Sequence, residues 1–283
     1  MNLIGIMLAV GPAVAPTVGG LTMEIAGWRA VFVIMAGFGV AVVAVALFAL
    51  KETVKADLSR LKPLELLRSY GILLTNGHFM TVALVIGGST GAIYAQATFL
   101  PFILMDEVGL SPTQFGLSMM MQSLSFFSGA LVARQLMKRM SAYSLVPAGL
   151  ALIAVGSAGT SLLHFWEPGL FRVMVPVGIY AFGIAFVMPA MTTAVLAPFA
   201  RIAGAAAALS GFFQMGSGLL VGMIGALMGD PVLAMGTLIP LMGVVAIAAY
   251  LVYRLHPHLA EPEPRSDVIA SMPPGRTLMK GED

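Results

Sequence analysis

The stretch LIGIMLAVGPAVAPTVGGLT, residues Leu3–Thr22, is long and apolar enough to cross a lipid bilayer as a single helix. Its second half, from Gly11 to Gly20, concentrates glycine and proline. A proline inside a helix costs about 3 kcal/mol and leaves a carbonyl group unpaired, and lipid cannot hydrate that group. Glycine lets two helix backbones approach closely, which is a main source of association energy in lipid. We therefore predict that this segment packs against other helices; a generic kinked contact is the alternative.

Further apolar stretches follow along the chain. Hydrophobic residues make up 59% of the 283 residues, charged residues only 10%, and the mean hydropathy is +0.95. No soluble domain of this length has such a composition, so the sequence predicts an all-α polytopic membrane protein with about eight transmembrane helices. We place the spans at Leu3–Thr22, Trp28–Leu50, Phe79–Leu104, Thr113–Ala133, Ala142–Leu163, Leu170–Leu196, Ile202–Met228 and Val232–Tyr253.

One long polar connection, rich in Lys and Arg, separates the second span from the third. Within it, the amphipathic run LELLRSYGILL (Leu64–Leu74) fits either a helix at the membrane interface or an ordinary basic linker. The end of the chain is rich in proline and charge, which predicts a disordered tail. These features predict four parts: the remnant of one bundle (1–50, two helices), a cytoplasmic linker (51–78), a six-helix bundle (79–253) and the tail (254–283).

The charged residues orient the predicted spans, because Lys and Arg in short loops are retained in the cytoplasm. The linker, the turn around Lys138, Arg201 and the tail carry basic residues and fall on one side. Arg29 and Arg172 are the exceptions that fall on the opposite side, together with the acidic turns. We therefore expect both termini in the cytoplasm and expect the periplasmic turns to contain Asp106, Glu107, Glu167 and Asp230.

Several motifs resemble a known family. Gly11, Pro16, Gly19 and Gly20 match the G-x3-G-P-x2-G-G antiporter motif in the fifth helix of drug/proton antiporters of the major facilitator superfamily, with Ala15 in place of one glycine. The segments AIYAQATFLPF, LSPTQFG and MPAMTTAVLAPFARIAGAAAALSGFFQ resemble helices 7, 8, 10 and 11 of its bicyclomycin/chloramphenicol-resistance (Bcr/CflA) branch. The resemblance implies a secondary active transporter of the bacterial inner membrane that exports hydrophobic drugs in exchange for protons.

The resemblance also indicates which helices of the transporter this chain corresponds to. If Leu3 begins the fifth helix, the chain corresponds to helices 5 to 12 of a twelve-helix transporter, a partial major facilitator fold that lacks the first four helices. We expect Gly19 and Gly20 to press against the opposite bundle, and we expect the chain alone not to drive drug efflux. The alternative function is that of a non-transporting remnant or a partner subunit of a membrane complex.

Polar side chains recur at helical spacing on spans that the resemblance assigns to the wall of a central cavity. One stripe passes through Gln122 and another through Gln214. In the span from Phe79, Tyr94 and Gln96 lie on different faces, so only one of them can point fully at a cavity. Bonding between helices is the alternative role for such residues. The candidate substrate-binding residues are Tyr94, Gln96, Gln122, Tyr180 and Gln214.

The sequence offers no residues for enzyme chemistry. It contains no cysteine, and its four histidines never stand at a helical metal-ligand spacing within one span. No ionisable residue lies at the centre of a predicted span. Such a residue would indicate a functional group, because placing a charge in the bilayer centre is energetically costly. We expect no catalytic residue, no metal, no other cofactor and no nucleic-acid partner. The expected partners are the lipid bilayer, hydrophobic small-molecule drugs and protons.

Overall fold

The computed structural model of the chain describes residues 15–49 and 63–255, and within these ranges it consists of helices and short connections without a strand. Seven of the described helices are long and apolar enough to cross a membrane. The prediction of an all-α polytopic membrane protein is therefore confirmed. The first predicted span lies only partly within the described ranges, where a helical segment covers residues 15–26.

The other helices follow the predicted spans closely. The ends of the spans that are described in full differ from the prediction by at most three residues, and the third span continues through a π-helical turn to Glu107. The bounds are α2 Trp28–Ala49, α3 Pro63–Thr75, α4 Gly77–Pro101, η2 Phe102–Glu107, α5 Pro112–Leu136, α6 Ala142–Ser161, η3 Leu162–His164, α7 Leu170–Leu196, η4 Ala197–Ile202, α8 Ala203–Met228 and α9 Pro231–Leu255.

Local side chains fix where several helices begin. Ser111 and Gln114 form a reciprocal capping box at the start of α5. Asn76 accepts a hydrogen bond from the Phe79 backbone amide over 3.0 Å at the start of α4. These bonds satisfy amides that the first helical turn leaves without an internal partner. Gly229 ends α8 with a φ of 72°, a left-handed conformation that suits glycine.

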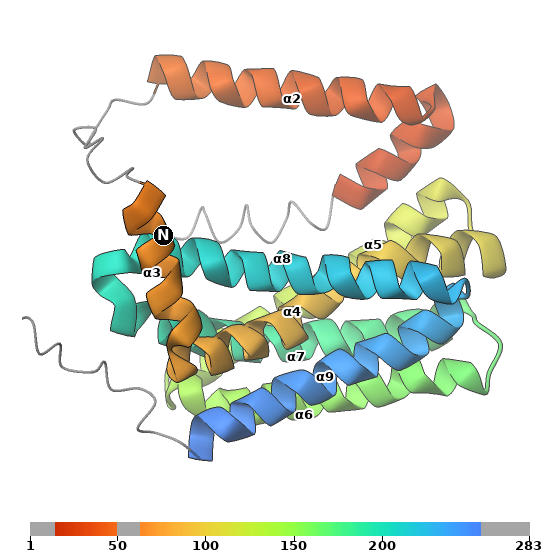
Figure 1. Cartoon of the computed structure of the whole chain (residues 1–283). Helices are drawn as coiled ribbons and strands as arrows, with labels where there is room; N and C mark the ends of the chain where they lie inside the picture. Colours follow the sequence, from red (N-terminus) through yellow and green to blue (C-terminus); the bar gives the residue numbers. More distant parts are fainter. Residues whose placement is uncertain (1–14, 50–62, 256–283) are drawn as a thin grey trace, which may run out of the picture.

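The six helices α4 to α9 form one bundle whose packing does not follow chain order (Figure 1). Helix α4 packs chiefly against α8 and α9, whereas α7 packs chiefly against α5 and α6. Helices α4 and α7 are also the most buried spans, and α5 and α8 are the least buried spans of the bundle. The bundle therefore consists of two interlocked groups of three helices, with α4 and α7 at its centre.

Glycines set the closest approaches between these helices. A Cβ atom added to Gly149 on α6 would lie 2.8 Å from the Gly183 carbonyl oxygen on α7, and the reverse distance is 2.7 Å. On the α4–α8 contact, a Cβ atom at Gly218 would lie 2.9 Å from the Gly91 carbonyl oxygen. A side chain at these positions would force the helices apart. Backbone proximity of this kind supplies the van der Waals contact that holds helices together in lipid.

Helices α2 and α3 are not among the six helices of this bundle. Helix α2 runs apart from it (Figure 1), and no residue in its apolar window is buried. The predicted linker contains α3, which spans the amphipathic run and packs its buried Leu73 near the beginning of α4. The Leu64–Leu74 run is thus helical. Nearly all of the predicted tail, from residue 256 onward, lies outside the described residues.

Candidate transport site

The segment that carries the glycine–proline motif lies against the first half of α5. A Cβ atom added to Gly116 on α5 would lie 2.6 Å from the Pro16 carbonyl oxygen. A Cβ atom added to Gly20 would overlap the Pro112 carbonyl group. The Thr17 hydroxyl donates a hydrogen bond to the Gly116 carbonyl oxygen over 3.2 Å. The two backbones therefore meet at positions where only small residues fit.

Not every residue of the motif takes part in this contact. Gly20 is buried, but a Cβ atom at Gly19 would meet nothing within 4 Å. The expectation that both glycines press against the bundle is therefore wrong for Gly19, because the helix turns that position away from α5. Gly11 lies outside the described residues.

The carboxylate of Glu24 adds hydrogen bonds to the contact between segment 15–26 and α5. Glu24 accepts hydrogen bonds from the Thr113 hydroxyl over 2.6 Å and from the Thr113 backbone amide over 3.3 Å. The Thr113 hydroxyl, helped by Ser111 and the Thr113 amide, holds the pKa of Glu24 below its ordinary value. The start of a helix also favours negative charge through its dipole. The sequence marks Glu24 only as a charge beside a turn, and its partner 89 residues away could not be read from it.

Two of the predicted cavity residues meet across helices. The Gln122 amide on α5 donates a hydrogen bond to the Gln96 side-chain oxygen on α4 over 3.3 Å. Gln96 is fully buried and Gln122 is half-buried. The Gln96 side-chain nitrogen has no hydrogen-bond partner among the described residues. The pair therefore contains one hydrogen bond between two helices and one buried N–H group that has no partner among the described residues.

The other three candidates lie in different surroundings. Tyr180 is fully buried on α7, and its hydroxyl donates toward the Gly88 and Ser89 carbonyl oxygens of α4. Tyr94 is 40% exposed and packs its Cβ atom beside Gly218 of α8, while Gln214 is half-buried on the same helix. Tyr180 therefore joins two helices and lines no open surface, which is the alternative role considered for these residues.

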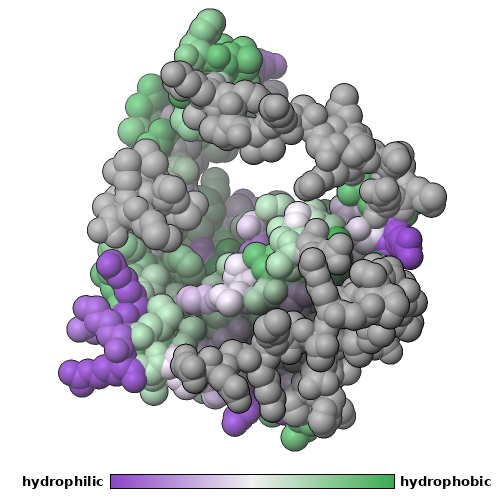
Figure 2. All heavy atoms as spheres, turned by 90° about the vertical axis from the view of Figure 1, so that its left-hand side faces the viewer, coloured by the Kyte–Doolittle hydropathy of each residue, from purple (hydrophilic) through white to green (hydrophobic). Residues whose placement is uncertain are grey.

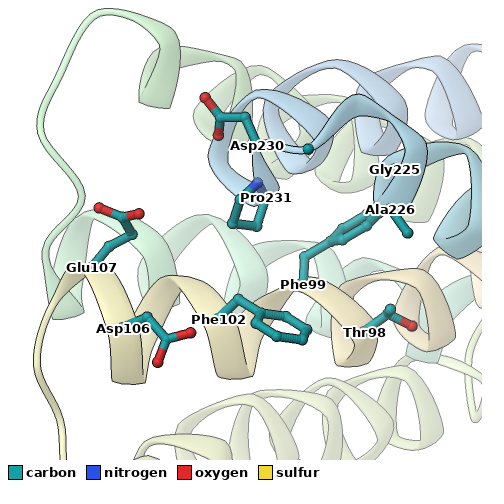
Figure 3. Close-up of a pocket in the computed structure, with 10 residues that line it drawn as sticks. Thr98, Phe99, Phe102, Asp106, Glu107, Gly225, Ala226, Asp230 and Pro231 are labelled. Carbon is teal, nitrogen blue, oxygen red and sulfur yellow. The ribbon is translucent and has the colours of Figure 1, made fainter.

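A separate cavity opens at the end of the bundle that carries the acidic turns. It has a volume of about 350 Å³ and lies between the end of α4 with η2 and the connection from α8 to α9 (Figure 3). None of the five predicted cavity residues lines it. The predicted third span ends at Leu104, with Asp106 and Glu107 in a turn, whereas the helix continues through Glu107, so the sequence did not predict the wall of this cavity.

The opposite end of the bundle carries basic residues. The turn after α5 contains Lys138 and Arg139, and Arg254 lies at the end of α9. Figure 2 looks onto this end and shows hydrophilic groups at its margin, with apolar atoms over much of the rest of the described surface. The two ends of the bundle therefore differ in charge.

Comparisons with known proteins agree with this architecture. The sequence model of the Major Facilitator Superfamily matches residues 1–226. Multidrug resistance protein D of Escherichia coli (strain K12) is 28% identical over 257 residues, which cover 88% of this chain and 63% of that protein. Multidrug transporter MdfA of Escherichia coli O6:H1 is 26% identical over 218 residues, covering 73% of this chain and 50% of the relative.

A further relative, the chloramphenicol resistance protein of Pseudomonas aeruginosa, is 24% identical over 227 residues, which are 80% of this chain and 52% of that protein. The chain thus spans between half and two thirds of the length of these relatives. The family consists of membrane transporters and not of enzymes, in agreement with the sequence analysis. With its several membrane-spanning helices and a match over most of its length, the chain belongs to the major facilitator superfamily.

Proposed function

We propose that the chain forms part of a secondary active transporter that exports hydrophobic small-molecule drugs by proton antiport, of the bicyclomycin/chloramphenicol type. The observation that carries the proposal is the contact of segment 15–26 with α5, where Pro16 and Gly20 meet the backbone of the bundle. The motif residues Pro16 and Gly20 hold this contact in the proposal, and Gly11 and Gly19 belong to the same motif. The printed names of the relatives, which refer to multidrug resistance and chloramphenicol resistance, support the same class of substrate.

The proposed substrate surface lies beside the Gln96–Gln122 pair. Helices α5 and α8 are the least buried spans of the bundle, and the half-buried Gln122 and Gln214 lie on them. Drug-binding sites are predominantly apolar with a few polar groups that fix orientation. In the proposal, Tyr94, Gln122 and Gln214 contact the substrate, Gln96 orients Gln122, and Tyr180 holds α4 and α7 in place behind them. Residues 1–50 belong to the opposing bundle, 51–78 link the two bundles, and 79–253 form the second bundle.

The proposed location is the bacterial inner membrane, with both termini in the cytoplasm. The charge difference between the two ends of the bundle supports this orientation, because basic loops stay inside. Alkaline phosphatase fused after Glu167 should therefore be active, and the same enzyme fused after Arg139 should be inactive. The reverse pattern would overturn the orientation.

Efflux from cells tests the transport proposal. A hybrid that joins this chain to the part of the E. coli multidrug resistance protein D outside the matched region would be expressed in a pump-deficient strain. We expect the hybrid to lower ethidium accumulation, and we expect a protonophore to remove the effect. The chain by itself and a Gln122→Ala hybrid serve as comparisons. A hybrid that reaches the membrane in normal amounts but shows no protonophore-sensitive efflux would refute the proposal.

A further inference from the structure

The cavity at the acidic end of the bundle combines aromatic and acidic walls. Its lining includes Phe99 and Phe102 from α4 and η2, Glu107 from the end of η2, and Asp230 and Pro231 from the α8–α9 connection. In Figure 3 the Phe99 ring points toward α8, and the Phe102 ring lies below it along the cavity. A volume of about 350 Å³ is within the usual range for sites that bind small molecules.

The π-helical turn decides which side chains border this cavity. The Val108 amide donates to the Ile103 carbonyl oxygen over 3.0 Å, a bond between residues five apart. In an α-helix, residue 107 would point about 140° away from residue 102. A π-helix completes each turn with between four and five residues, so Asp106 and Glu107 come to flank the direction of Phe102. Figure 3 shows their carboxylates on either side of η2. Turns of this kind occur frequently at functional sites.

The charge of the cavity is not balanced by its walls. Among the described residues, the lining contains three carboxylates, Asp106, Glu107 and Asp230, and no lysine, arginine or histidine. Asp230 is partly engaged, because one oxygen accepts hydrogen bonds from the Val232 and Leu233 backbone amides over 2.8 and 2.9 Å. Asp106 and Glu107 are exposed. A ligand with a positive charge would therefore meet unbalanced negative charge next to aromatic rings.

We propose that this cavity is a peripheral binding site for a monovalent organic cation, a quaternary or protonated amine with an apolar body. The cationic group lies at the acidic end of the cavity, beside Asp106 and against the face of Phe102, with the Glu107 carboxylate contributing negative charge from the other side of η2, and the apolar body lies toward Phe99. Cations bind aromatic faces through the ring quadrupole, and this attraction adds to that of the carboxylates. A bare metal ion fits the site less well, because among the described residues no three acidic or histidine side chains are grouped to hold one.

The site is distinct from the proposed transport surface and does not depend on the proposed function. It shares no residue with the Gln96–Gln122 pair or with the contact of segment 15–26. Two sources can supply the same chemistry: a free amine outside the cell and the amine headgroup of a neighbouring phospholipid. Both present one cationic nitrogen beside apolar carbon.

Equilibrium dialysis of the detergent-purified full chain with radiolabelled benzyltrimethylammonium tests the proposal. We expect saturable binding that unlabelled probe displaces and that benzyl alcohol, which has the ring without the charge, does not displace. The Asp106→Asn/Glu107→Gln double variant should lower the affinity on the order of ten-fold. Phe102→Leu keeps an apolar side chain and removes the ring, and it should lower the affinity about three-fold.

Glu167→Gln is the matched control, because Glu167 is an exposed acidic residue on the same side and does not line the cavity. Its affinity should equal that of the original chain. Loss of affinity in Glu167→Gln as large as in the double variant would overturn the proposal, since it would reveal general surface charge. Equal binding by the double variant and the original chain would overturn it as well.

A last comparison separates the two sources of the amine. The dialysis is repeated in nanodiscs of phosphatidylglycerol alone and of phosphatidylglycerol mixed with phosphatidylethanolamine. Weaker probe binding in the mixed discs assigns the site to the lipid amine, and unchanged binding assigns it to a free amine. Either result supports an amine site, and absence of saturable binding in both discs and in detergent refutes it.

Discussion

Tyr180 on α7 donates a hydrogen bond to the backbone carbonyl oxygen of Gly88 on α4 over 3.1 Å, at a point where both residues are buried. The Ser89 carbonyl oxygen lies at 3.2 Å from the same hydroxyl. The bond joins the two most buried spans of the bundle. Because α4 and α7 belong to different groups of three helices, this single side chain helps to hold the two groups together.

Replacing Tyr180 by phenylalanine should lower the free energy of unfolding by about 0.5–1 kcal/mol, because hydrogen bonds between membrane helices are worth about that much. The ring and its packing stay in place. Unfolding of the purified chain in mixed micelles with increasing dodecyl sulfate measures the change. Tyr94→Phe is the control, since Tyr94 is partly exposed, and it should leave the unfolding curve unchanged. Equal loss in both variants would contradict the role of the Tyr180 hydroxyl.

Alanine at Gly20 and at Gly19 should have opposite effects. The methyl group at residue 20 would overlap the Pro112 carbonyl group, so we expect a loss of about 1–3 kcal/mol from overpacking. At residue 19 the methyl group meets open space, and alanine should add about 0.5–1 kcal/mol by restricting the unfolded chain. Thermal unfolding in detergent gives both signs. Gly39→Ala, also in open space, should behave like Gly19→Ala.

The glutamine pair should show strong coupling in a double-mutant cycle. Gln122→Leu removes the group that donates to the buried Gln96 side-chain oxygen, so it should cost about 1–3 kcal/mol. Replacing both residues by leucine removes the unpaired group as well, and the double variant should recover most of that loss. Chemical unfolding of the two single variants and the double variant measures the coupling. Additive losses would show that the two amides do not interact.

The Glu24–Thr113 contact predicts a pH dependence with a defined sign. The pKa of Glu24 is lowered by the Thr113 hydroxyl, so the contact contributes stability above the ordinary pKa of 4.5 and loses it as the pH falls through the lower folded value. A carbon-13 NMR titration of labelled glutamate carboxyls should show this. Thr113→Val should move the Glu24 pKa upward toward its ordinary value. A pKa that does not respond to Thr113→Val would exclude the hydrogen bond.

The sequence was sufficient to place the helices. Apolar length located the spans, and proline and glycine marked most of their ends. The Gly11–Gly20 motif also indicated a close helix contact, and Gly20 lies at one. These features depend on residues near one another in the chain, so periodicity and local backbone preferences can be read without knowing the fold.

The structure was needed for features that depend on helix rotation and on distant partners. Gly19 and Gly20 look equivalent in the motif, and only the orientation of the helix on α5 separates them. Tyr180 suited an apolar pocket by residue type, but its hydroxyl finds carbonyl groups about 90 residues earlier in the chain. The π-helical turn before Val108 leaves no recognisable pattern, because it adds one residue to a turn without changing the composition.

The interlocked packing of the bundle has a consequence for biosynthesis. Helix α4 leaves the ribosome about 125 residues before α8, and α8 and α9 supply most of its contacts. During translation, the polar and glycine-rich faces of α4 are therefore exposed to lipid or to the insertion machinery until α8 and α9 have been synthesised and inserted. Tertiary folding of this bundle is then a late event, because the central helix α4 gains most of its packing only after α8 and α9 have been synthesised.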